Sequence, residues 1–162
     1  MQRREHGLHR DINMAHFAKL KEQTDPTGFT SNTHLVVQTV IAVYNKHVPS
    51  DKHIDGETWC KNFYNNHDTI WKQTSYNHNF RKQYCGKGYT FDAAKNKFIS
   101  PKPHASWSLD GDDDWQAPVT YPSDTTDKRI VWNEAGQKWT ATDLDGNNSY
   151  DWDASALAWV SA

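Results

Sequence analysis

The chain has 162 residues, only 36% of them hydrophobic, and a formal net charge of -2. This length suffices for one domain with a real core. No run approaches the roughly 20 apolar residues of a membrane helix, and no apolar segment follows the basic start. We therefore expect neither a secretory signal nor a membrane partner.

The composition and the charge distribution narrow the class further. Eight Trp against six Leu indicate that aromatic rings rather than aliphatic side chains supply much of the packing. Residues 1–100 hold 14 Lys/Arg against 9 Asp/Glu, a net +5, whereas residues 101–162 hold 4 against 11, a net -7. The positive excess is too dilute for a nucleic-acid footprint, and the acidic end opposes a polyanion. We expect no nucleic-acid partner.

Residues 1–13 are polar and basic and show no apolar periodicity, which predicts a disordered arm. From Met14 onward, apolar residues are interspersed with polar ones. We therefore expect Met14 to be the natural start and the arm to be upstream translated sequence. The alternative is a basic arm that docks a partner.

Residues 14–87 are predicted to form a small mixed α/β unit. The β-branched run Leu35–Tyr44 is the strongest strand in the sequence, and its near-continuous apolarity predicts burial on both faces. Trp59 and Phe63 stand at helical spacing, which predicts a short helix at 58–64. Weaker strands are expected at 16–20 and 70–76, and a loop at 24–33.

Residues 88–162 contain a repeat, in which two aromatic residues stand seven apart and Asp or Asn follows the first. The three copies are Phe91/Phe98, Trp132/Trp139 and Trp152/Trp159. A fourth, degenerate copy around Trp107 and Trp115 is one residue shorter. Such a period indicates a repeated supersecondary unit.

A β-hairpin explains this spacing, because residues i and i+7 then face each other as cross-strand aromatic pairs. In the Trp132 copy the expected turn is Ala135-Gly136, with Gly136 adopting the positive φ of a tight turn. A lone hairpin is marginal in water, so the units must pack on each other, on the first unit or on a partner. The predicted fold class is α+β: a small α/β unit followed by Trp-rich successive β-hairpins at 88–162.

The candidate binding residues are the Trp side chains of these hairpins, because exposed indoles stack on sugar rings. The competing interpretation, which we favour, is that the rings form the core of a Leu-poor module. The six residues are Trp107, Trp115, Trp132, Trp139, Trp152 and Trp159.

No catalytic, metal or cofactor motif is present, so we expect a protein that is not an enzyme and binds no metal or cofactor. The nine His lack ligand spacing. The Asp-rich stretch 143–151 has its Gly at the wrong position for an EF-hand, which favours a solvated turn. Cys60 and Cys85 fit two free thiols better than a disulfide, although pairing stays open.

Short motifs follow one another in a fixed order along the chain: Met14–Lys19, Trp71, Gln73–Asn77, Arg81-Lys82, Gly86, Gly88-Tyr89, Phe91-Asp92, Phe98-Ile99, Pro101–Pro103, Ser106–Asp110, Trp115–Val119, Trp132–Glu134 and Trp139. This ordered series resembles a family of small uncharacterised proteins encoded by marine tailed phages, including those of cyanobacteria and pelagic bacteria. The resemblance covers about residues 14–140. Two departures are the long segment 24–33 and the Trp152/Trp159 copy, which looks added.

The resemblance implies a phage-encoded virion component, and it supplies no catalytic residue. We expect a non-enzymatic virion accessory or structural protein that acts by protein–protein contact, with capsid, tail fibre and baseplate all left open. Its partners would be phage structural proteins or copies of itself, in the virion or in the cytoplasm of the infected bacterial host. The alternative is a carbohydrate-binding module that recognises a host-surface glycan through exposed Trp.

Overall fold

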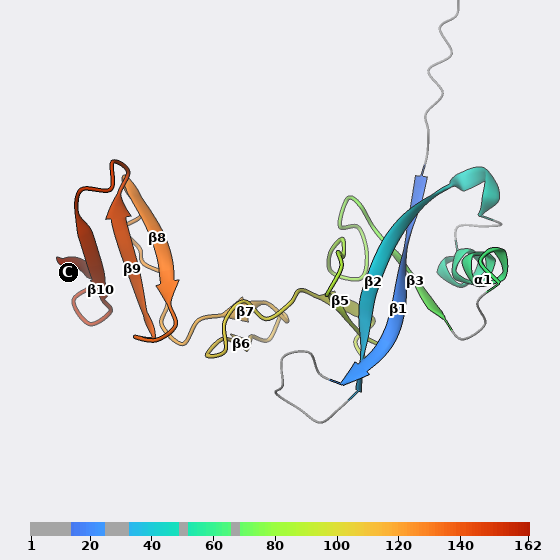
Figure 1. The fold of residues 1–162 in the computed structure, drawn as a ribbon, viewed down its shortest axis with the longest axis horizontal. Coiled ribbons are helices and arrows are strands. Elements are labelled where there is room, and N and C mark those ends of the chain that lie inside the picture. Colours follow the sequence, from blue (N-terminus) through green and yellow to red (C-terminus); the bar gives the residue numbers. More distant parts are fainter. Residues whose placement is uncertain (1–13, 25–32, 49–51, 66–68) are drawn as a thin grey trace, which may run out of the picture. The chain divides into compact units, whose positions relative to one another are not determined.

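The computed structural model describes residues 14–24, 33–48, 52–65 and 69–162, and its fold is α+β with antiparallel sheet predominating (Figure 1). The chain divides into two compact units, Met1–Pro101 (unit 1) and Lys102–Ala162 (unit 2). The predicted arm and the interior of the predicted loop at 24–33 lie outside the described residues. None of the described helices has the length and apolarity needed to span a bilayer.

Unit 1 is built on a five-stranded sheet in the order β3-β1-β2-β4-β5, and its strands pair antiparallel. The central strands β1 (Met14–Thr24) and β2 (Thr33–Tyr44) contain two of the predicted strands. Because the pairing is antiparallel throughout, unit 1 is one helix on an antiparallel sheet rather than a run of alternating strands and helices. The outer strands are β3 (Ile70–Thr74), β4 (Thr90–Asp92) and β5 (Lys97–Ile99).

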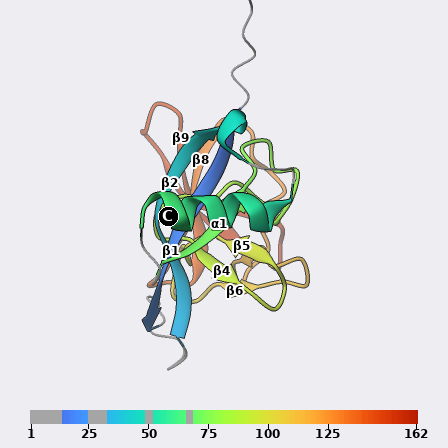
Figure 2. The ribbon, with the colours of Figure 1, turned by 90° about the vertical axis from the view of Figure 1, so that its right-hand side faces the viewer.

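A core lies on each face of this sheet, because successive side chains of a strand point to opposite faces. On one face Phe17 packs with Val43 beneath helix α1 (His53–Phe63), which crosses the sheet in Figure 2. On the other face Val37 packs with Phe98. The predicted two-sided burial of β2 therefore holds for these positions, whereas Ala42 is exposed.

Helix α1 extends further toward the N-terminus than the expected 58–64, because it starts at His53. It approaches the sheet closely at Gly56, where an added Cβ would lie 2.4 Å from Cζ of Phe17. A larger residue at this position would push the helix off the ring. Gly56 thus serves helix–sheet packing, although glycine is a poor helix former.

A buried ion pair closes the free edge of β3. Arg81 Nη1 lies 2.6 Å from Glu57 Oε1, and both side chains are only 6% exposed. Glu57 accepts a hydrogen bond from the backbone N–H of Gln73 at 2.9 Å, and Arg81 donates to the Gln73 carbonyl at 2.7 Å. The pair therefore satisfies backbone groups that an edge strand would otherwise leave open to another chain.

The Phe91/Phe98 hairpin belongs to unit 1, which corrects the boundary expected at residues 87 and 88. Its strand β4 pairs with β2, placing Phe91 opposite Leu35. Both rings are buried in the same core as Val37, so this hairpin completes the first sheet. The division between the units falls at Pro101 and Lys102.

Unit 2 consists of hairpins, as the repeat predicted. The first is short, with Leu109 opposite Trp115. The two Trp-pair hairpins join into one four-stranded sheet in the order β11-β10-β9-β8. The strands are β6 (Ser108–Leu109), β7 (Trp115–Gln116), β8 (Lys128–Asn133), β9 (Lys138–Asp143), β10 (Ser149–Asp153) and β11 (Ala158–Ser161).

The three full copies of the repeat share one turn, and it differs from the expected two-residue turn. In the Trp132 copy four residues separate the last pair, Asn133 and Lys138, and the positive φ of 46° falls on Gln137 rather than on Gly136. Asn133 Oδ1 accepts a hydrogen bond from the backbone N–H of Gly136 at 3.0 Å. This bond explains why Asp or Asn follows the first ring, since such side chains stabilise a turn by binding its backbone.

Candidate functional site

The structure places the six predicted Trp residues in the core of unit 2 or at its margin. Trp132, Trp139 and Trp152 are buried, with at most 8% of each residue exposed. The other three, Trp107, Trp115 and Trp159, are half-buried. Five of the six lie in one cluster, from which Trp115 is absent.

The rings are paired inward on one face of the β8–β11 sheet. Trp132 lies opposite Trp139 with ring centroids 5.1 Å apart, and Trp152 lies opposite Trp159 at 5.0 Å. Both pairs are edge-to-face, a favoured geometry for aromatic pairs. Trp107, from the segment before β6, covers this face in an edge-to-face contact with Trp139, with ring centroids 5.9 Å apart. The rings therefore do not form a planar exposed row.

Hydrogen bonds within unit 2 fix three of the clustered indoles, whereas the buried ring N–H of Trp107 has no partner among the described residues. Trp139 donates its ring N–H to the carbonyl of Val119 at 2.8 Å, and Trp159 donates to the carbonyl of Asp124 at 2.8 Å. Trp132 donates to Glu134 Oε2 at 2.7 Å. A sugar platform needs free polar groups beside the ring, whereas these donors are already used.

Glu134 ties the Trp132 ring to the covering segment. It accepts hydrogen bonds from the backbone N–H of Ser106 at 2.7 Å and from its hydroxyl at 2.8 Å. The hydrogen bond from Trp132, followed by those from Ser106, lowers the pKa of Glu134 below its ordinary value. The carboxylate is thus a structural acceptor in its charged form.

Several exposed rings of unit 1 lie near α1, where the sequence analysis placed no site, whereas the exposed Tyr76 lies apart from them and stacks on His16. Phe63 is 65% exposed, and Tyr44 and Tyr64 are each about half exposed. The spacing of Trp59 and Phe63 predicted the helix, but spacing alone does not say which ring faces water. The exposed face of Phe63 is therefore a feature that only the tertiary structure reveals.

These rings form a continuous ladder that we name the aromatic strip. His47, in the short helix η1 (Asn45–His47), stacks on Trp59 at 5.8 Å, and Trp59 stacks on Phe63 at 4.8 Å. Tyr64 in turn stacks on the buried Trp71 at 5.3 Å, which anchors the strip to β3. The strip comprises Tyr44, His47, Trp59, Phe63, Tyr64 and Trp71.

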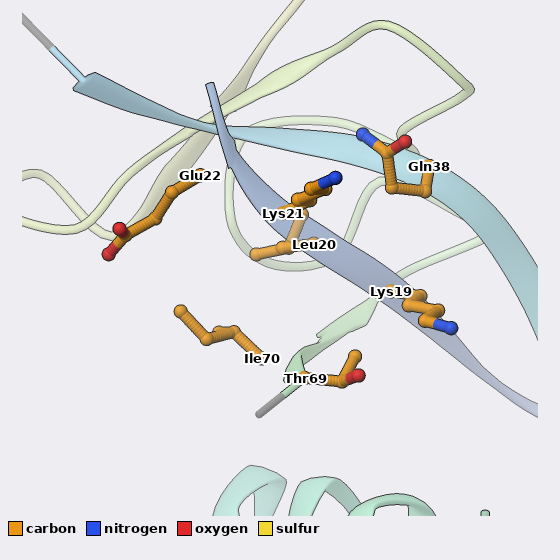
Figure 3. A pocket seen from close by; sticks show the side chains of 7 residues that line it. All are labelled: Lys19, Leu20, Lys21, Glu22, Gln38, Thr69 and Ile70. Carbon is orange, nitrogen blue, oxygen red and sulfur yellow. The ribbon is translucent and has the colours of Figure 1, made fainter. Parts of the chain in front are cut away.

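A cavity of about 660 Å³ opens beside β1 in unit 1 (Figure 3). Its lining combines two amines, one carboxylate and aliphatic side chains. This mixture of opposite charges does not define one class of ligand. The lining residues are Lys19, Leu20, Lys21, Glu22, Gln38, Thr69 and Ile70.

The two cysteines are free and buried, and they lie in the cores on opposite faces of the sheet. Burial, with a smaller effect of the Glu57 charge, raises the pKa of Cys60 to about 12. Burial also raises the pKa of Cys85. Because the thiolate is the reactive form, neither residue is suited to act as a nucleophile.

Potential metal ligands are scattered: within the described ranges no three His, Cys, Asp or Glu gather closely enough to hold an ion.

No family model, curated protein or solved structure matches the chain. The described residues hold three larger aromatic groups: the Trp cluster of unit 2, the aromatic strip of unit 1, and His16 with Tyr76 and Tyr84. The Trp cluster of unit 2 is internal, and the aromatic strip of unit 1 is exposed.

Proposed function

We propose that this chain is a phage-encoded, non-enzymatic virion accessory protein that acts by protein–protein contact. The observation that carries the choice of class is the inward pairing of the Trp rings in unit 2. Rings paired edge-to-face with their N–H groups bound inside the unit stabilise the fold. They leave little ring surface for a sugar.

The aromatic strip further supports a role in protein–protein contact. Large apolar side chains gathered on one surface of a small protein typically mark an interaction site. Aromatic residues are enriched at protein interfaces, where they supply most of the binding energy. The phage origin and the virion location rest on the resemblance in residues 14–140.

Mass spectrometry of purified particles of a phage that encodes this chain tests the proposal. We expect the protein at a constant copy number per particle, both before and after a high-salt wash. The matched control is a phage-encoded enzyme known to stay in the cell, measured in the same particles and in the infected lysate. Abundance in the lysate combined with absence from particles contradicts the virion location.

Glycan binding is the alternative class, and Trp115 is its best remaining candidate. This ring is half-buried, lies outside the Trp cluster and has the Lys102 amine 5.6 Å from its centroid. A glycan array with wild-type protein and Trp115→Ala compares the classes. We expect no bound glycan, and a signal that disappears in the variant would reverse the choice.

A further inference from the structure

We infer that the aromatic strip of unit 1 binds unit 2 of a second copy of this chain. The inference rests on the proposed contact function and names its partner. It predicts head-to-tail association of the protein in solution. Three observations carry it: the exposure of the strip, the opposite charges of the units, and two exposed valines on one sheet face of unit 2.

The strip presents a rigid apolar surface. Phe63 is 65% exposed, yet its ring is held by stacking on Trp59 and by an edge contact of 5.1 Å with Tyr64. Rings fixed before binding lose little conformational freedom when a partner covers them. Exposed, preorganised aromatic side chains are the usual anchors of a protein interface.

The charge around the strip selects an acidic partner. Lys46 lies over the ring of Tyr44 at 5.5 Å, and Lys61 occupies the last turn of α1. Unit 1 carries 14 Lys/Arg against 9 Asp/Glu, whereas unit 2 carries 4 against 11, so their net charges are +5 and -7. Opposite net charges steer two copies into contact between unlike units and oppose contact between like units.

Unit 2 offers a mixed row on the face of the β8–β11 sheet opposite the Trp rings, in which two valines flank a threonine and the Asp151 carboxylate that pairs with Lys138. The pairing aligns Val131, Thr140, Asp151 and Val160 across all four strands. Val131 is 59% exposed and Val160 is 52% exposed. We name the row Val131, Thr140, Asp151 and Val160 the open face.

Such a contact joins two different surfaces and is therefore heterologous. Each copy has both a strip and an open face, so association either closes as a reciprocal dimer or continues to larger species. A variant that lacks one surface keeps the other. This asymmetry allows a complementation test that a symmetric contact cannot pass.

Sedimentation velocity of the full chain is the first measurement. Protein concentrations of about 1 to 500 µM cover micromolar affinities. We expect the average mass to rise with concentration in about 0.02 M NaCl and to fall again in about 0.5 M NaCl, where screening weakens the attraction between the units. A monomer throughout this range overturns the inference.

Phe63→Ser should abolish the association, because it removes the most exposed ring of the strip. Ile54→Ser is the matched control: Ile54 lies on the same helix and is 62% exposed, but it is not part of the strip. Far-UV circular dichroism and melting temperature establish that both variants fold. Equal effects of the two substitutions, or no effect of Phe63→Ser, contradict a role for the strip.

Complementation identifies the partner surface. The double variant Val131→Lys/Val160→Lys should be monomeric alone, as should Phe63→Ser. An equimolar mixture should form a one-to-one complex, because one variant retains the strip and the other retains the open face. A mixture that stays monomeric overturns the assignment of the second copy.

The outcome is separable from the test of the proposed function. A chain found in particles but monomeric in solution overturns the inference and leaves the virion location standing. A chain that associates as described but is absent from particles overturns the virion location alone.

Zero-length carbodiimide cross-linking of mixed unlabelled and ¹⁵N-labelled protein supplies an independent check. It should join Lys46 or Lys61 to a unit 2 carboxylate of the other isotopic form.

Discussion

The Phe91/Phe98 hairpin of unit 1 and the Trp132/Trp139 hairpin of unit 2 use the same local structure in different surroundings. In each, the rings face each other across the strands, at 5.0 and 5.1 Å. In each, the Asp or Asn after the first ring accepts a backbone hydrogen bond in the turn. Yet the first hairpin extends a sheet with two cores, and the second lies in a sheet whose rings gather on one face.

The difference follows from the side chains. A Phe ring has no polar atom, so Phe98 is fully buried in an aliphatic core with Val37. A buried indole usually finds an acceptor, although the ring N–H groups of Trp71 and Trp107 have none among the described residues. Trp139 finds one in the Val119 carbonyl, on a covering segment that unit 2 supplies itself. The hairpin is thus a shared local unit, and the ring chemistry decides what can cover it.

Truncating one ring in each hairpin gives the largest expected effect. Phe98→Ala and Trp139→Ala should each cost about 3–5 kcal/mol, as large aromatic side chains in cores do. Hydrogen–deuterium exchange should locate the loss in unit 1 for the first and in unit 2 for the second. Trp115→Ala, outside the cluster, is the control and should cost less. Protection lost equally in both units would contradict the separation of the cores.

Arg81→Met tests the ion pair that distinguishes unit 1 from unit 2. We expect a loss of about 3 kcal/mol, the lower end for a broken buried pair, because Lys72 stays 3.5 Å from Glu57. Lys72→Met should cost under about 1 kcal/mol, since this amine is partly exposed. Urea melts compare the two. Equal losses of stability would show that Arg81 is not the main residue that stabilises the edge strand β3.

Gly56→Ala tests the close contact between α1 and the sheet, a feature that unit 2 lacks. The new Cβ would overlap the Phe17 ring, so we expect a loss of about 1–3 kcal/mol. In an unconstrained helix the same change stabilises by up to about 1 kcal/mol. Thermal melts therefore test the sign. Phe17→Leu should partly relieve the overlap when combined with Gly56→Ala.

Removing the side-chain hydrogen bond of the shared turn should cost the same stability in both hairpins. Asp92→Ala and Asn133→Ala each remove one exposed hydrogen bond to the turn backbone, at a cost of about 1 kcal/mol. Chemical denaturation of the two variants measures this cost. Ala135→Ser in the same loop should stay within about 0.5 kcal/mol of wild type. Unequal effects of Asp92→Ala and Asn133→Ala would mean that the surroundings alter the turn.

Acid should weaken the Trp hairpin through Glu134, the carboxylate that binds Trp132 and Ser106. The pKa of Glu134 is lowered by folding, so its contribution is complete above its unfolded pKa and disappears as pH falls through the folded one. The difference in urea midpoint between wild type and Glu134→Gln should therefore shrink below about pH 4. A difference that persists in acid would show that the charge of Glu134 is not the cause.

The sequence by itself determined the local elements. Seven-residue spacing of large rings placed the three hairpins, since cross-strand pairing and a short turn are properties of neighbouring residues. The β-branched run at 35–44 placed the main strand, because strand propensity also depends on residues that are close in the sequence. The interpretation of the Trp rings as core also agrees with the burial of Trp132, Trp139 and Trp152.

Only the tertiary structure decided how these elements combine. Pairing of Phe91 with Leu35 joins residues far apart in the chain, and no local spacing encodes it, so the unit boundary was placed too early. The predicted turn was also wrong in detail, because the loop has four residues and the positive φ falls on Gln137. Exposure of Phe63 likewise depends on which side of α1 meets the sheet. The side that meets the sheet carries the buried Gly56, Glu57 and Cys60, and Gly56 lies against Phe17 of β1, which is distant in the sequence.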